Sequence, residues 1–134
     1  MKTEGGTVSW LRIHRYKCKH CGRVHSAVPD CLARFKHYTA DIIASVIDGR
    51  ITEDDLDVED YPCGQTMMLW KAWFQLNIQF IEGYLRSVQS RILNDSTAFD
   101  HTEISLLEKL RKQPDWLRIV NRIICNSGGA LSPC

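Results

Sequence analysis

The chain has 134 residues, which is enough for one domain with a hydrophobic core or for two very small domains. Its apolar fraction of 44% and its charged fraction of 25% are those of an ordinary globular protein and exclude a low-complexity chain. The start does not resemble a secretory signal, and no apolar run reaches the roughly 20 residues that cross a bilayer. We therefore expect a cytoplasmic protein without membrane attachment, whose six cysteines are thiols or metal ligands.

The charges are unevenly distributed along the chain. Residues 1–37 carry eight Lys and Arg side chains against two carboxylates, whereas residues 38–60 carry one Arg against eight carboxylates. A basic head of this kind is typical of proteins that bind nucleic acid. The alternative is that the basic head and the acidic segment neutralise each other within the fold.

The first elements predicted are two strands that flank a tight turn. Residues 7–16 alternate imperfectly between apolar and polar side chains and predict a strand, and residues 24–28 predict the returning strand, which Pro29 ends. Between them lies Cys18-Lys-His-Cys-Gly22, in which the glycine permits a sharp backbone turn. The pattern is that of one knuckle of a zinc ribbon.

Cys18 and Cys21 are close enough in sequence to bind one metal ion. A redox motif is one alternative, but such motifs usually open a helix, and a turn without metal is another. We favour a structural zinc ion, which requires further ligands because such sites hold four. The candidates for the third and fourth ligands are His25 and Cys31, which would give the set Cys18, Cys21, His25 and Cys31. His14 and His20 are alternatives.

The next segment predicts a short helix followed by an acidic linker. Thr39 is a good N-cap for a helix over residues 40–48, and Gly49 is a natural stop. Thr52 and Asp55 have the spacing of a capping box, which indicates at most one helical turn. Residues 57–62 form the linker.

Residues 64–93 form the longest periodic segment. Apolar residues recur at alternating steps of three and four, which predicts one long amphipathic helix or two helices with a bend near Asn77 or Gly83. The stripe consists of Met67, Trp70, Phe74, Asn77, Ile81, Leu85, Val88 and Ile92. After a loop, Thr102 is the expected N-cap of a short helix that includes Leu107 and Leu110, and a last apolar stripe runs from Trp116 to Ile124.

The predicted fold is mainly α with a small N-terminal β-hairpin: a zinc-ribbon-like knuckle followed by a helix-turn-helix-like bundle. The expected units are residues 7–31, residues 32–93 and residues 94–134. The helices at 40–48 and 64–93 would form the helix-turn-helix, and the start of the second would enter the DNA major groove. Gln65, Thr66 and Lys71 could then reach bases or phosphates. The alternative is an ordinary core helix, and the long connection between the two helices favours it.

Six short motifs, in order, resemble a family of uncharacterised bacterial proteins associated with transposons. They are Arg15-Tyr-Lys-Cys-Lys-His-Cys-Gly-Arg-Val-His, Val28-Pro-Asp, Phe35-Lys-His-Tyr-Thr, Glu59-Asp-Tyr-Pro-Cys, Thr66-Met and Trp70-Lys-x-Trp. The family is similar to the DNA-binding front end of insertion-sequence transposases. The resemblance covers about residues 8–93 and implies a zinc-ribbon-like head and a DNA-binding role.

Three features depart from that family. Its members often have an earlier Cys-x-x-Cys, so we expect either that this chain is N-terminally truncated relative to them or that His25, Cys31 or a second chain completes the site. Met68 and Leu69 stand where basic residues are usual in a recognition helix. About 40 residues follow position 93, too few for a nuclease domain, so we do not expect the activity of a whole transposase.

The sequence therefore predicts a non-catalytic protein that binds double-stranded DNA and has no small-molecule substrate. The residues expected to contact phosphates are Arg12, Arg15, Lys17, Lys19 and Arg23. The alternative is a helical interaction or homodimerisation module, in which the 67–92 stripe and the two C-terminal helices form a helical bundle or a homodimer and the knuckle is structural. No spacing of nucleophile and base indicates an enzyme.

Overall fold

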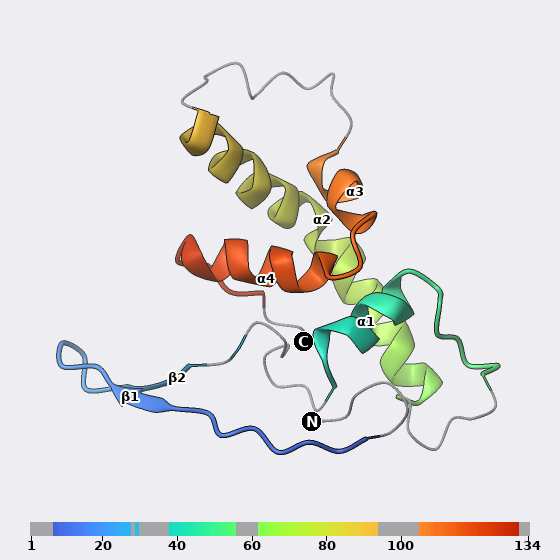
Figure 1. Cartoon of the computed structure of the whole chain (residues 1–134), viewed down its shortest axis with the longest axis horizontal. Coiled ribbons are helices and arrows are strands. Elements are labelled where there is room, and N and C mark those ends of the chain that lie inside the picture. The colour runs from blue at the N-terminus through green and yellow to red at the C-terminus, as the bar shows by residue number, and fades with distance from the viewer. Residues whose placement is uncertain (1–6, 28, 30–37, 56–61, 94–104, 132–134) are drawn as a thin grey trace.

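The computed structural model describes residues 7–27, 29, 38–55, 62–93 and 105–131. Within these residues a two-stranded antiparallel hairpin precedes four helices, which confirms the mainly helical fold (Figure 1). The elements are β1 (Arg15–Lys17), β2 (Val24–Ser26), α1 (Ala40–Ile47), α2 (Gly64–Leu93), α3 (Leu106–Arg111) and α4 (Trp116–Asn126). No described helix combines the length and the apolar character that a membrane span requires.

Helix α2 is the element around which the other helices pack. It is continuous over 30 residues, so neither Asn77 nor Gly83 breaks it. Helices α1, α3 and α4 all contact it. Trp70 and Phe74 of α2 are each 1% exposed, and the Phe74 ring meets the Trp116 ring of α4 edge-on with centroids 5.4 Å apart. The core therefore lies where three helices cover one side of the fourth.

The predicted 67–92 stripe belongs mainly to this internal core. Met67, Ile81 and Leu85 are buried, as are Trp70 and Phe74. Ile92 departs from the prediction because 75% of its side chain is exposed near the helix end. The buried residues of the stripe are therefore packed against the chain's own helices.

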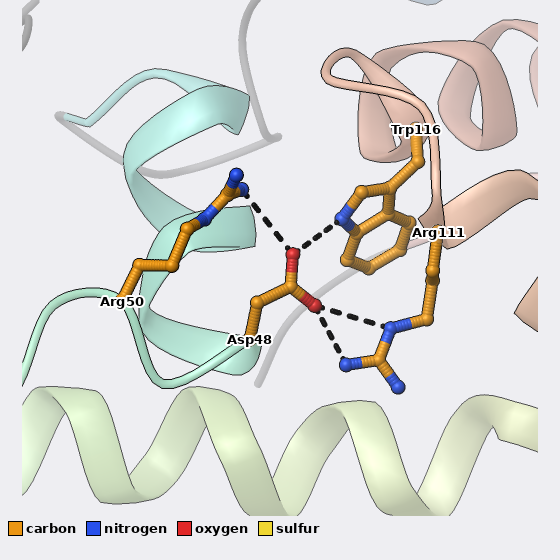
Figure 2. Close-up of polar contacts among 4 residues, drawn as sticks. All are labelled: Asp48, Arg50, Arg111 and Trp116. Carbon is orange, nitrogen blue, oxygen red and sulfur yellow. Dashed lines mark hydrogen bonds and ion pairs between the residues drawn. The ribbon is translucent and has the colours of Figure 1, made fainter.

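Helix α1 forms as its sequence predicts. Thr39 is the N-cap, and its hydroxyl oxygen accepts a hydrogen bond from the Ile42 amide at 3.4 Å. Ile42 and Ile43 are buried, and Gly49 has a φ of +73°, the left-handed conformation that ends many helices. Asp48 follows the last helical residue and binds side chains at α3 and α4, which joins the three elements (Figure 2).

The prediction at the start of α3 was wrong. The helix begins at Leu106, and its N-cap is Ser105, whose hydroxyl accepts a hydrogen bond from the Glu108 amide at 3.3 Å. Thr102 lies outside the described residues. Glu82 of α2 accepts hydrogen bonds from the backbone amides of Leu106 and Leu107 at 2.9 and 3.0 Å. A carboxylate on another helix therefore binds the free amides that a helix start always presents.

Two other local predictions need correction. Thr52 and Asp55 do interact, because the Thr52 amide donates to the Asp55 carboxylate at 2.7 Å, but the described residues there form a turn and no helix. The strand predicted over residues 7–16 is wrong, because β1 contains only Arg15–Lys17. The returning strand β2 ends at Ser26. The ladder therefore contains three residues on each side of the knuckle, and one hydrogen bond from the Ala27 amide to the His14 carbonyl at 2.8 Å extends it at its open end.

Candidate metal centre and nucleic-acid interface

The hairpin places its residues on two faces by strict alternation. Tyr16 pairs with His25, while Arg15 pairs with Ser26 and Lys17 with Val24. Directly opposed residues of an antiparallel pair point to the same face of the sheet. Arg15 and Lys17 therefore lie on one face, and His25 lies on the other.

The turn between the strands is closed by backbone hydrogen bonds. The Cys18 amide donates to the Arg23 carbonyl at 2.8 Å, and the Gly22 amide donates to the Cys18 carbonyl at 2.9 Å. Gly22 has a φ of +68°, which residues with a Cβ rarely adopt. This glycine therefore allows the turn that brings the two cysteines together.

Three side chains meet beside this turn. Their ligand atoms, the sulfur atoms of Cys18 and Cys21 and a ring nitrogen of His25, all lie within 4.8 Å of one another. The Cys21 sulfur is 3.9 Å from Nε2 of His25. Tetrahedral Zn–S and Zn–N bonds of about 2.3 and 2.0 Å would separate such atoms by roughly 3.5 Å. The group can hold a metal ion after a small contraction.

The surroundings of Cys18 favour the ionised form that binds metals. Hydrogen bonds from the backbone of Cys21 and then of His20 lower the pKa of the Cys18 thiol, and the Cys21 side chain contributes in the same direction. Burial opposes the shift but is outweighed. A thiolate is the form of cysteine that ligates metals. Cys31, the fourth expected ligand, lies outside the described residues.

The hairpin has no apolar core of its own. All six strand residues are exposed, and among the described elements the strands lie against each other and against no helix. An isolated two-stranded hairpin is marginally stable in water. A metal ion at Cys18, Cys21 and His25 would join the turn to β2 and supply the missing constraint.

The predicted phosphate-binding residues gather on this hairpin. We call residues 12–27 the basic arm, which extends away from the helices in Figure 1. Its five basic side chains are all exposed, and it contains no acidic residue. They are Arg12, Arg15, Lys17, Lys19 and Arg23. Tyr16 lies on the face of the hairpin opposite Arg15 and Lys17 and is 61% exposed, and sequence reasoning did not single out its ring for binding.

The second predicted group, at the start of α2, has a different environment. Gln65 and Lys71 are exposed, but Thr66 is half-buried and its hydroxyl lies 3.3 Å from the Cys63 sulfur. The carboxylate of Glu53 lies over the helix start, where a Cβ added to Gly64 would be 2.5 Å from its carboxyl carbon. This carboxylate, which sequence reasoning missed, would repel a phosphate.

The chain belongs to the DUF6431 family, a domain of unknown function, whose match covers residues 1–70. The matched region contains the basic arm, helix α1 and the first two turns of α2. Neither the curated proteins nor the solved structures contain a significant match. The transposase resemblance and the helix-turn-helix therefore stay predictions.

Proposed function

We propose that this protein is a non-catalytic DNA-binding protein of a mobile genetic element, and that its basic arm contacts the phosphates of duplex DNA. The observation that carries the proposal is the charge of the arm. Five exposed basic side chains occur within residues 12–27 without one carboxylate. Basic residues that neutralise phosphates release condensed counterions, which drives binding to DNA.

The arrangement of these charges suits a backbone contact. Arg15 and Lys17 project from one face of β1, while Lys19 and Arg23 flank the turn at the tip. A narrow two-stranded ribbon can enter a DNA groove and still reach phosphates on its sides. The proposal rests on the arm and not on Gln65, Thr66 and Lys71, because the Glu53 carboxylate lies at the start of their helix.

The metal in this proposal is zinc with a structural role. Two thiolates and an imidazole are typical zinc ligands, and we assign the fourth position to Cys31. The ion would hold the turn so that Lys19 and Arg23 keep fixed positions. The assignment is tested by loading the protein with Co²⁺ in place of zinc and replacing each cysteine in turn with serine. Each thiolate that binds the ion contributes to the sulfur-to-cobalt charge-transfer absorption. Loss of intensity in Cys31→Ser supports the four-ligand set.

The DNA proposal is tested by fluorescence anisotropy with a short mixed-sequence duplex over a range of salt concentrations. With five phosphate contacts, the logarithm of the binding constant should fall against the logarithm of salt with a slope of about −4.5. The double variant Arg15→Gln/Lys17→Gln should reduce the slope by about 1.8 and weaken binding at low salt.

A matched control distinguishes the loss of charge in the basic arm from the loss of the same charge elsewhere on the protein. Lys112→Gln/Arg122→Gln removes the same two charge types from exposed positions on the helical body. This control should leave the slope within about 0.5 of that of the unaltered protein. Equal effects of both double variants, or the absence of binding at low salt, would contradict the proposal.

A further inference from the structure

Helix α2 has a second apolar face, on the side away from the core. Leu69, Ala72, Leu76, Phe80 and Gly83 follow at steps of three and four, so they line one side of the helix. Leu69, Leu76 and Phe80 are 59%, 85% and 44% exposed. We call these five residues the outer α2 face.

This face lacks the charges that solvent-exposed helix surfaces normally carry. Between Lys71 and Glu82 the helix contains no charged residue, and the exposed polar positions are Gln75 and Gln79. Depletion of charge together with an aromatic residue is typical of the centre of protein interfaces. A second outer α2 face is likewise uncharged and apolar over the same length, so the face is complementary to itself.

We propose that the outer α2 face binds the same face of a second copy of this chain, with the two helices antiparallel about a two-fold axis at Leu76. In that arrangement, residues equally distant from Leu76 face each other. Ala72 then opposes Phe80, four residues to either side, and Leu69 opposes Gly83, seven residues to either side. Leu76 meets Leu76 of the second copy at the axis, and Phe80 and Leu69 each meet a small residue.

Gly83 supplies an independent argument for a close neighbour. Glycine weakens a helix relative to alanine, and a Cβ at Gly83 would meet nothing within 4 Å in the chain itself. Packing among the described residues therefore gives no reason for glycine at this position. The close approach of a partner's Leu69 gives one.

Three further features favour this dimer. The Phe80 ring is held edge-on against Tyr84, with centroids 4.8 Å apart, so it is positioned before binding. A parallel copy would place Phe80 against Phe80 and Gly83 against Gly83, which crowds one layer and leaves a void in the other. The antiparallel pair also sets the two helix dipoles in opposite directions.

The experiment is sedimentation equilibrium of the full chain without DNA, from low micromolar to near-millimolar concentration. We expect a monomer–dimer equilibrium that persists in EDTA, because the metal group lies outside the interface. Leu76→Glu should raise the dimer dissociation constant at least about tenfold, because it brings two carboxylates together at the axis. Mixing Leu76→Glu with Leu76→Lys should restore the dimer as a heterodimer.

Two variants make the test specific. Ile92→Glu introduces the same charge at a 75% exposed position of α2 outside the face, and it should leave the dimer unchanged. Gly83→Leu should strengthen the isolated helix yet weaken the dimer, because it fills the space that Leu69 of the second copy needs. A monomer at every concentration, a dimer lost in EDTA, or a dimer that survives Leu76→Glu would overturn the proposal. DNA binding by the arm is measured separately and does not decide this result.

Discussion

Oδ1 of Asp48 accepts hydrogen bonds from both Nη2 and Nε of Arg111, at 2.6 and 3.1 Å, although the two residues are 63 positions apart in the chain. Oδ2 of the same carboxylate accepts from the indole nitrogen of Trp116 at 2.9 Å (Figure 2). The guanidinium of Arg111 also lies over the Phe74 and Trp116 rings, at 5.3 and 5.6 Å from their centroids. The end of α1 is therefore joined to α3 and α4 through one carboxylate.

Asp48→Ala should destabilise the protein by about 2–4 kcal/mol, because it leaves the Arg111 guanidinium and the Trp116 indole without an acceptor. Urea unfolding followed by circular dichroism measures the change. Arg50→Gln is the control, since Arg50 binds the same carboxylate from a side chain that is 56% exposed. Its effect should stay below about 0.5 kcal/mol, and equal losses in both variants would contradict the assigned role of Arg111 and Trp116.

Glu82 should make stability depend on acidity. Burial raises the pKa of its carboxyl, but hydrogen bonds from the Leu106 and Leu107 amides and from Ser105, with Arg86 nearby, outweigh burial and hold the pKa below its ordinary value. A lowered folded-state pKa means that the stabilisation is present above the unfolded-state pKa of about 4.3 and is lost as pH falls through the folded-state value.

Glu82→Gln should therefore be less stable than the unaltered protein at pH 7, by about 1–3 kcal/mol, and the difference should shrink as the solution is acidified below about pH 4. Urea titrations at several pH values measure it. Glu108→Gln removes an exposed carboxylate from the first turn of α3 and should give a smaller difference. A Glu82→Gln deficit that is constant with pH would contradict this account.

Metal removal should loosen the basic arm and leave the helices intact, because the described strands contact no helix. Trypsin can cut after each Lys and Arg of the arm, so the rate of limited digestion measures how well ordered the arm is. We expect cleavage within residues 12–23 to accelerate about tenfold or more in EDTA and in Cys18→Ser, while circular dichroism stays unchanged. Cys125→Ser, which alters an exposed cysteine of α4, should behave like the unaltered protein. Arm cleavage insensitive to EDTA would exclude a metal constraint.

Cys63 should react with iodoacetamide faster than an ordinary exposed thiol near neutral pH. The side chain and then the backbone of Thr66 donate hydrogen bonds that lower the pKa of the Cys63 thiol. Thr66→Val removes the first of these donors. Its Cys63 alkylation rate at pH 7 should fall by a few fold, and mass spectrometry of the tryptic peptides measures the rate at each cysteine. An unchanged rate at Cys63 would mean that the Thr66 hydroxyl does not stabilise the thiolate.

Local signals were sufficient for some elements and insufficient for others. Thr39 and Gly49 mark the ends of α1 because capping depends on residues within one turn. The knuckle residues Cys18 and Cys21 were identified from their close spacing, and His25 from its spacing after Cys21. The structure brings the three together, because β2 returns beside β1 and pairs His25 with Tyr16. The strand expected from residue 7 failed because β pairing requires a partner, and β1 and β2 pair over only three residues on each side.

Contacts between distant segments could not be read from the sequence. The start of α3 at Leu106 depends on Glu82, which lies 24 residues away on another helix. The periodicity of α2 located its buried side correctly at Trp70 and Phe74. It did not indicate that Leu69 and Leu76 form an exposed apolar face on the opposite side. Exposure, which decides between core and interface, depends on where α1, α3 and α4 pack.

The dependence of α3 on Glu82 has a consequence for the order in which the protein assembles. Six residues are too few for a helix that persists alone in water, since helix nucleation is costly. We therefore expect α3 to form only once α2 has formed and presented its carboxylate. The 30-residue helix then orders its short neighbour, and the amide hydrogens of α3 should exchange faster than those at the centre of α2.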